Sequence, residues 1–243
     1  MPDPLGWAVL IVGALVASVV GGVAGFGAGI VMLPLVSWAL GVRSAVPVLT
    51  VTMLIGNLSR IWWSRGDIDR AVVVRFALGA VPATALGTVL YAGVPAEWLG
   101  RFVGVFLIAA VPLRRVLATD LFRMRLRHFP VLGAFIGLLS ALVVTTGPLN
   151  TPFFLAYGLR RNAYIGTESV CAMSMHLARG AALARYALLT WETAAVGCVL
   201  GGTMFAGAWL GRRALQQMSD RVFLGIIEVL LVAMGLHSLL FPR

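Results

Sequence analysis

Residues 4–42 read PLGWAVLIVGALVASVVGGVAGFGAGIVMLPLVSWALGV and contain no charged side chain. A helix needs about 20 residues to cross the roughly 30 Å hydrocarbon core of a bilayer, so this stretch is long enough for nearly two crossings. Glycines interrupt it at positions 21, 22, 25, 27 and 29. We therefore predict two membrane segments, at about 6–24 and 28–41, joined by a glycine break.

The chain as a whole is strongly apolar. Of its 243 residues, 60% are hydrophobic and 12% are charged, and the mean hydropathy is +0.96. Average soluble domains have about 25% charged residues, so these values exclude a soluble enzyme, a disordered chain and a disulfide-rich secreted module. The N-terminus lacks the basic region of a secretory signal, and residues 5–24 are expected to remain as a membrane span.

Uncharged runs place the other segments. Residues 129–159 are again too long for one crossing, and Thr145-Thr146-Gly147-Pro148 interrupts them. The predicted fold is all-α and polytopic, with about ten hydrophobic segments in two inverted repeats. The further segments lie at about 45–63, 71–92, 98–113, 163–187, 193–211 and 221–241. The first repeat is placed at 1–118, a basic cytoplasmic linker at 119–129 and the second repeat at 130–243.

An internal repeat is indicated by short matches that keep the same order in both halves. Gly25–Pro34 aligns with Val143–Pro152, and Gly41-Val42-Arg43 aligns with Gly158-Leu159-Arg160. Farther on, Thr50-Val51-Thr52 pairs with Thr167-Glu168-Ser169, and Asn57 pairs with Ser174. Five crossings in each half would invert the second half, which is the architecture of many secondary transporters.

The charge of the chain is strongly positive. The net charge is +10, and all 19 basic residues are arginines. In the ten-segment arrangement 13 arginines lie on one side of the membrane and 4 on the other. Because cytoplasmic loops collect positive residues, this count puts both termini outside the cytoplasm and the basic linker inside it. We interpret the charge as loop charge and expect no nucleic-acid partner.

The two breaks are the first candidate site. Irregular backbone inside a membrane survives only where protein or water satisfies it, and a helix that starts there offers N–H groups to an anion. The residues concerned are Gly25, Gly27 and Gly29 in the first half, and Thr145, Thr146, Gly147 and Asn150 in the second. The alternative interpretation is a tight turn that lets helices pack through small residues.

The second candidate site is the polar side of the segment at 163–187, with Thr50, Thr52, Asn57 and Arg60 as the matching set in the first half. Ionisable groups within a bilayer are costly and usually functional. Glu168 is a candidate for a coupling proton, or for a structural hydrogen bond, and Glu228 for a proton site or the partner of an arginine. The polar residues of this segment are Thr167, Glu168, Ser169, Cys171, Ser174, His176 and Arg179.

Motifs of enzymes are missing from the sequence. It has no HExxH, GxSxG or P-loop pattern and no Cys/His cluster with metal-ligand spacing, so no metal and no cofactor are expected. Asp67 and Asp69 lie beside Arg65 and Arg70, and we interpret them as a solvated turn rather than as paired catalytic carboxylates.

Three features together resemble the sulfite exporter TauE/SafE family over about residues 8–240. They are the block GFGAGIVMLPLVSWALGV, a Gly-Asp-Ile-Asp loop after the third segment, and a Pro-bearing break followed by Tyr164-Ile165-Gly166-Thr167-Glu168-Ser169. The resemblance implies a polytopic permease that moves small sulfur-containing anions across a bacterial inner membrane. The second break departs from the usual glycine-rich form of the family.

The sequence therefore predicts a secondary transporter for small anions of the sulfite, organosulfonate, sulfoacetate or thiosulfate class, embedded in membrane lipid. Two alternatives remain open, an intramembrane enzyme using Glu168 and His176, and a non-transporting accessory protein. Substrate identity, direction and oligomeric state stay open. The predicted coupling or gating residues are Glu168, Arg179 and Glu228. The predicted substrate-binding residues are Gly25, Gly27, Gly29, Thr50, Asn57, Thr145, Thr146, Gly147, Asn150, Thr167 and Ser174.

Overall fold

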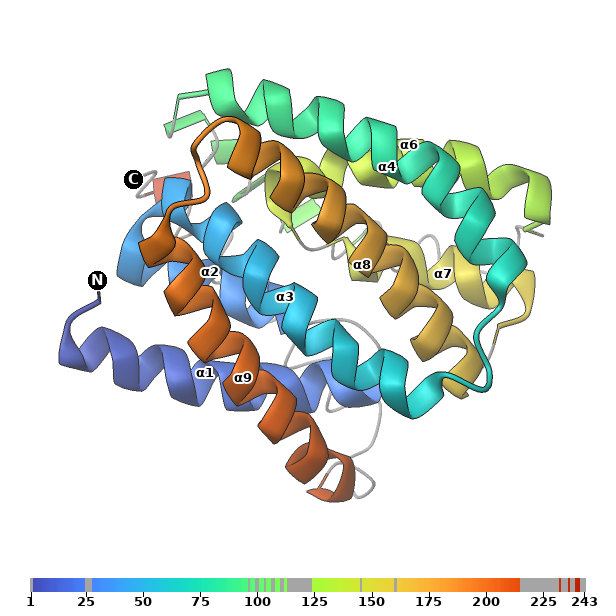
Figure 1. Ribbon diagram of the computed structural model, residues 1–243, viewed down its shortest axis with the longest axis horizontal. Coiled ribbons are helices and arrows are strands. Elements are labelled where there is room, and N and C mark those ends of the chain that lie inside the picture. The colour runs from blue at the N-terminus through green and yellow to red at the C-terminus, as the bar shows by residue number, and fades with distance from the viewer. Residues whose placement is uncertain are drawn as a thin grey trace.

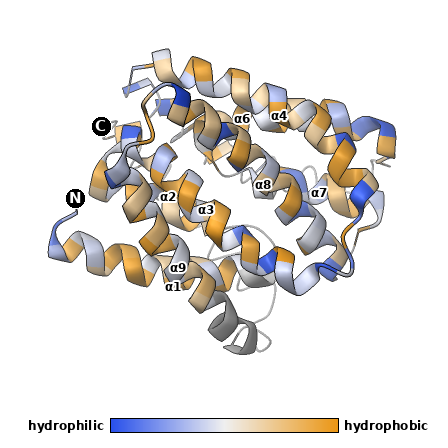
Figure 2. Cartoon of the chain, viewed as in Figure 1, coloured by the Kyte–Doolittle hydropathy of each residue, from blue (hydrophilic) through white to orange (hydrophobic). Residues whose placement is uncertain are grey.

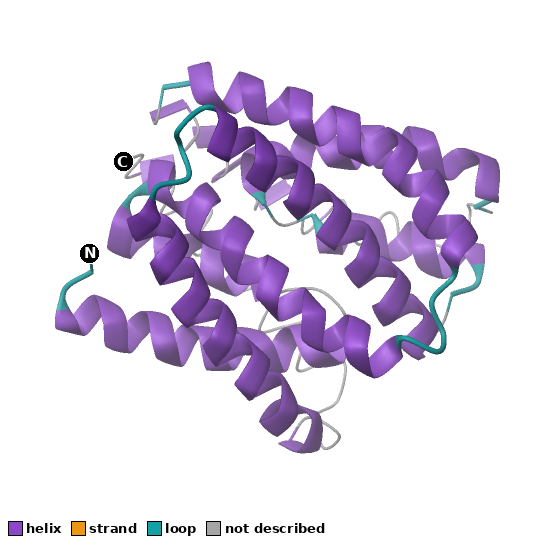
Figure 3. Cartoon of the chain, in the orientation of Figure 1, coloured by secondary structure: helices purple, strands orange, loops and turns teal. Residues whose placement is uncertain are grey.

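A computed structural model describes residues 2–24, 28–95, 124–144, 146–159 and 161–214, with short pieces between 97 and 112 and between 232 and 240. Over these residues the chain is helical, with eight α-helices and one 3-10 turn (Figures 1 and 3). The predicted all-α class is confirmed for this part of the chain. Most of the segment expected at 221–241, and much of that at 98–113, lies outside the described residues.

The helices of the two halves follow one another in the same order. Those of the first half are α1 (Pro4–Ala24), α2 (Ala28–Leu40), α3 (Val42–Ser64) and α4 (Arg70–Gly93). Those of the second half are η1 (Leu126–His128), α6 (Phe129–Val143), α7 (Gly147–Tyr157), α8 (Arg161–Arg185) and α9 (Trp191–Ala214). One helix ends and another begins within each of the two long uncharged runs. Helices α1 and α2 share the run at 4–42, and helices α6 and α7 share the run at 129–159.

Three of the described helices are long and apolar enough to cross a membrane, namely α1, α3 and α4. Figure 2 shows, by colour, hydrophobic residues along these helices and hydrophilic residues along α8. At about 1.5 Å per residue, α2 is about 20 Å long and α7 about 16 Å, both shorter than the roughly 30 Å core of a bilayer. Neither short helix is therefore long enough to cross a membrane by itself.

Helix ends follow local sequence signals. Asp69 caps α4, because its Oδ1 accepts a hydrogen bond from the Val72 amide at 3.0 Å, so the Asp67–Asp69 turn serves to start a helix. Gly41 follows α2 with φ +81°, and Gly158 follows α7 with φ +109°. Glycine adopts this left-handed region at little cost, which explains why both short helices stop at the glycines that the sequence alignment pairs.

The fourth helix of each half packs against the opposite half. Helix α4 lies on α6 and α8, whereas α9 lies on α1 and α3, and α3 and α8 contact each other between them (Figure 1). Ser64 lies next to Gly166 and Thr50 next to Gly180, so α3 and α8 run antiparallel. The two sequence halves are therefore interlocked rather than packed as separate bodies.

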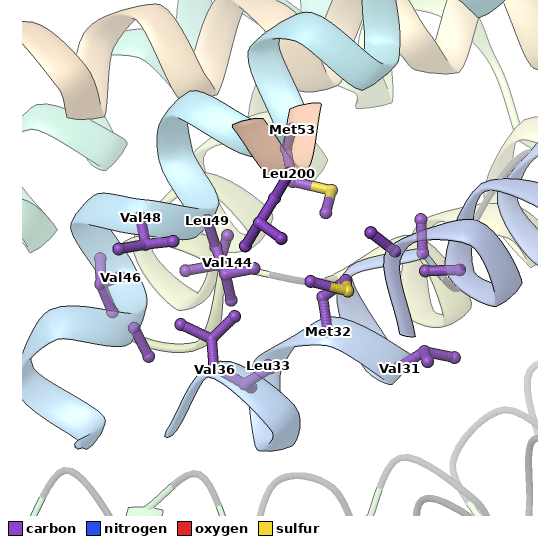
Figure 4. Close-up of a cluster of buried hydrophobic side chains, with 14 of the residues drawn as sticks. Val31, Met32, Leu33, Val36, Val46, Val48, Leu49, Met53, Val144 and Leu200 are labelled. Carbon is purple, nitrogen blue, oxygen red and sulfur yellow. The ribbon is translucent and has the colours of Figure 1, made fainter. Parts of the chain in front are cut away.

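The larger apolar core is formed mainly by α1, α2, α3 and α9 (Figure 4). Its fully buried members include Met32 of α2, Leu49 of α3 and Leu200 of α9. Val144, which follows the last residue of α6, belongs to this core although it comes from the second half. The second break is therefore anchored in apolar packing provided by the first half.

Small residues bring α4 and α6 into backbone contact. A Cβ atom on Gly79 would overlap the carbonyl oxygen of Pro130, and one on Gly133 would overlap that of Phe76. In a membrane, where lipid is as apolar as the helix surface, such close approach supplies the packing energy that holds helices together.

Contacts of two arginines show how the two halves correspond. Arg60 of α3 bonds the Gly21 carbonyl of α1, and Arg179 of α8 bonds the Ser140 carbonyl of α6, which is an offset of 119 residues for both members of each pair. This register pairs Asn57 with His176, whereas the sequence alignment pairs Asn57 with Ser174.

Candidate functional site

The two helix breaks lie at corresponding places in the two halves. Gly29 is buried in the first turn of α2, and Gly147 is the first residue of α7. The predicted residues Gly25, Gly27 and Thr145 lie outside the described part of the chain, as does Glu228.

The second break combines unusual backbone with buried polar groups. Val144 has φ +61°, a conformation that is strained for a β-branched residue. Thr146 is 3% exposed, and its side chain does not cap α7. Asn150 is 1% exposed, and its Oδ1 has no hydrogen-bond partner among the described residues. Buried polar groups normally have partners, so this break is a place where a polar ligand would be favoured.

Arg179 is the largest fully buried side chain among the described residues. Its guanidinium donates to the carbonyl and hydroxyl oxygens of Ser140, near the end of α6, and its Nη1 lies 3.0 Å from His176 Nδ1. Because a guanidinium can only donate, His176 accepts through Nδ1 and is neutral. The Nε of Arg179 has no partner within the described ranges.

Arg60 lies at the first break in a matching arrangement. Its guanidinium donates to Asn57 Oδ1 and, at 3.5 Å, to the carbonyl oxygen of Gly21 near the end of α1. A small pocket beside it has room for about one water molecule. The pocket is lined by Ser18, Gly21, Ala28, Gly56, Ser59, Arg60 and Met204.

Glu168 is buried near Arg60. The side chain is 4% exposed, its Oε2 has no partner in the described part of the chain, and it lies within electrostatic range of Arg60. Glu168 and Arg179 are not ion-paired, as their spacing of three helical turns predicts. The buried carboxylate therefore lies nearer to the arginine of the other half.

Several predicted donors are engaged in the protein itself. Thr50 donates to the Val46 carbonyl at 2.7 Å and Ser174 to the Cys171 carbonyl at 2.7 Å. Thr167 accepts from the Asp69 amide at 2.9 Å and so ties α8 to the turn before α4. Of the predicted polar side chains, Thr146 and Asn150 lie together at the second break. Thr50 and Ser174 bond carbonyls of their own helices, and Thr167 bonds the turn before α4.

Sequence reasoning missed two contributors to these surroundings. Ser140 was not selected, although it is a polar residue in the otherwise apolar α6 and binds Arg179. Tyr164 was not singled out either, and its hydroxyl lies 2.7 Å from that of Thr151 in α7. Within the described residues no three His, Cys, Asp or Glu side chains come together as metal ligands.

A comparison with protein families gives the decisive observation. The family model described as sulfite exporter TauE/SafE matches residues 9–238, which is nearly the whole chain. The chain belongs to the sulfite exporter TauE/SafE family. Searches among curated proteins and among solved structures gave no match.

Membership of the TauE/SafE family makes the chain a multi-pass membrane transporter rather than an enzyme. The enzymatic alternative based on Glu168 and His176 is therefore wrong. In the structure the Nδ1 of His176 is hydrogen-bonded to the guanidinium of Arg179. The TauE/SafE assignment also agrees with helices of membrane-spanning length and composition.

Proposed function

We propose that the chain is a secondary transporter for small sulfur-containing anions of the sulfite, organosulfonate, sulfoacetate or thiosulfate class. The observation that carries this proposal is the second break, where Thr146 and Asn150 are buried at the start of α7. Hydroxyl, amide and backbone N–H groups bind an oxyanion through hydrogen bonds alone. Because no covalent or metal bond has to be broken, the anion can also be released.

The two breaks form the proposed site together. Both precede a short helix, and Gly29 and Gly147 mark the first turns of those helices. Inverted repeats with interrupted helices at mid-membrane provide alternating access in many secondary transporters. The equivalent arginine contacts, Arg60 with Gly21 and Arg179 with Ser140, support such a repeat here.

The proposed orientation places both termini outside the cytoplasm of a bacterial inner membrane. It rests on the arginine count of 13 against 4 for a chain that crosses ten times. Thr167 and Asp69, which are hydrogen-bonded at 2.9 Å, fall on the same cytoplasmic side in this arrangement. The bond is therefore consistent with the proposed order of crossings.

Thr146→Val is expected to lower the uptake of sulfite into proteoliposomes by at least about tenfold, because it removes one hydroxyl bonded to a charged ligand. Gly27→Leu is expected to do the same by filling the first break. Thr203→Val is the matched control, since the Thr203 hydroxyl donates to the Val199 carbonyl of its own helix, α9, and is not among the predicted site residues. Normal uptake by both site variants, with normal expression, would show that the breaks do not form the site.

A further inference from the structure

Arg60 and Arg179 occupy equivalent positions in the two halves. Each has a polar partner three residues earlier in its own helix, Asn57 in α3 or His176 in α8. Each donates to a carbonyl of the helix before the break, Gly21 of α1 or Ser140 of α6, and both pairs are related by an offset of 119 residues.

These bonds explain why an arginine is tolerated at each break. The last carbonyls of a helix have no partner within the helix, and they carry the negative end of its dipole, equivalent to about half an elementary charge. A guanidinium at that position satisfies the carbonyl, but half a negative charge offsets only part of a full positive charge. A residual positive charge is therefore left at both breaks.

The two arginines differ in the charges that surround them. Arg60 has Glu168 within electrostatic range. Arg179 has no carboxylate within ion-pair distance among the described residues, and its neighbour His176 is neutral. By the same register the residue equivalent to Glu168 in the first half is Leu49, so the repeat does not supply a second carboxylate. The residual charge is thus concentrated at Arg179.

The two guanidinium groups also lie at different depths. Thr50 of α3 lies next to Gly180 of α8, so Arg179 is about level with residue 51. Arg60 is nine residues farther along α3, which corresponds to about 14 Å along the helix axis. His176 is within electrostatic range of both arginines. Among the described residues, the guanidinium of Arg60 therefore has a carboxylate within electrostatic range, whereas that of Arg179 has none within ion-pair distance.

We propose that Arg179 supplies the positive charge that binds the transported anion at the second break, and that Arg60 is its equivalent at the first break, balanced by Glu168. The inference rests on the proposed function and names a further binding residue for it. A buried, partly uncompensated cation is costly in a membrane protein, and an anionic ligand offsets that cost while it is bound. The unpartnered Nε of Arg179 leaves a donor for such a ligand.

The test uses the purified full chain and sodium sulfite, with gluconate as the reference anion. Sulfite is expected to raise the unfolding temperature of the unmodified protein, because it binds only the folded state. Arg179→Gln is expected to weaken sulfite binding by about ten- to a hundredfold, the range for one charged hydrogen bond. Arg75→Gln is the matched control, since Arg75 is exposed on α4.

A second pair of variants separates charge from folding. His176→Asp places a carboxylate beside the guanidinium and neutralises it while keeping the bonds to Ser140, whereas His176→Asn makes a change of similar size without charge. We expect sulfite binding to be at least about tenfold weaker in His176→Asp than in His176→Asn. This comparison is decisive if Arg179→Gln does not fold.

Two results would overturn the inference. One is a folded Arg179→Gln protein that binds and transports sulfite like the unmodified chain, and the other is equal sulfite binding by the two His176 variants. If the unmodified protein itself neither binds nor transports sulfite, sulfoacetate, an organosulfonate or thiosulfate, the proposed function fails instead. Measuring the unmodified chain in parallel therefore distinguishes the two failures.

Discussion

Gly79→Ala is expected to destabilise the protein by about 1–3 kcal/mol, although alanine is the better helix former. The added Cβ atom would overlap the Pro130 carbonyl oxygen and lie 2.8 Å from the Ala134 amide nitrogen. Both obstacles are backbone atoms, so they can be relieved only by moving α4 away from α6. That movement would weaken the packing of α4, from the first half, against α6, from the second half.

Gly202→Ala provides the matched control for this prediction. Gly202 is exposed in the middle of α9, and nothing lies within 4 Å of a Cβ atom placed there. We expect the same chemical change to leave stability unchanged or to raise it by up to about 1 kcal/mol. Thermal unfolding in detergent, followed by tryptophan fluorescence, measures both variants. Equal effects of the two substitutions would contradict the close packing of α4 and α6.

Glu168→Gln is expected to abolish the accumulation of anion driven by a pH gradient. We propose Glu168 as the carrier of the coupling proton because it is buried, has an oxygen without a described partner, and lies within electrostatic range of Arg60. One proton moving down one pH unit supports about tenfold accumulation of a co-transported anion. The glutamine variant keeps the shape of the side chain but cannot bind and release a proton. The pH gradient should therefore cause no accumulation of the anion in this variant.

Exchange transport distinguishes loss of coupling from loss of folding. Proteoliposomes loaded with unlabelled sulfite should still take up labelled sulfite through Glu168→Gln, since exchange needs no net proton movement. Glu192→Gln, at an exposed position in the first turn of α9, serves as the control and should keep full accumulation. Unchanged accumulation by Glu168→Gln would remove Glu168 from the coupling mechanism.

The positions of the helices could be predicted from the sequence because charge and glycine mark where a membrane segment begins and ends. The run at 4–42 predicted two helices with a break, and α1 and α2 end and begin within a few residues of the expected bounds. The stop of α2 at Gly41 and of α7 at Gly158 was visible as a sequence match, and both glycines have positive φ.

Contacts between helices could not be predicted in the same way. Hydropathy shows where the chain lies in a membrane but not which helix faces which, so the packing of α4 on α6 and of α9 on α1 did not follow from it. The partner of Arg179 was missed for the same reason, because Ser140 belongs to another helix 39 residues away in sequence.

The burial of several candidate residues could be predicted, whereas their roles stay a prediction. The importance of the breaks and the selection of Thr146, Asn150 and Arg179 came from residue type within an uncharged run, and the structure places these side chains in buried positions. The roles expected for Thr50 and Ser174 did not take account of helix geometry, in which a hydroxyl readily bonds the carbonyl one turn earlier.

Transport by the purified chain is the most direct test of the central claim that the protein carries small sulfur anions. Proteoliposomes should be assayed with sulfite, sulfoacetate, an organosulfonate and thiosulfate, each with and without a pH gradient, alongside empty liposomes. We expect saturable flux of at least one of these anions, raised by the pH gradient and lost in Thr146→Val. Flux equal to that of empty liposomes for all four anions would contradict the account.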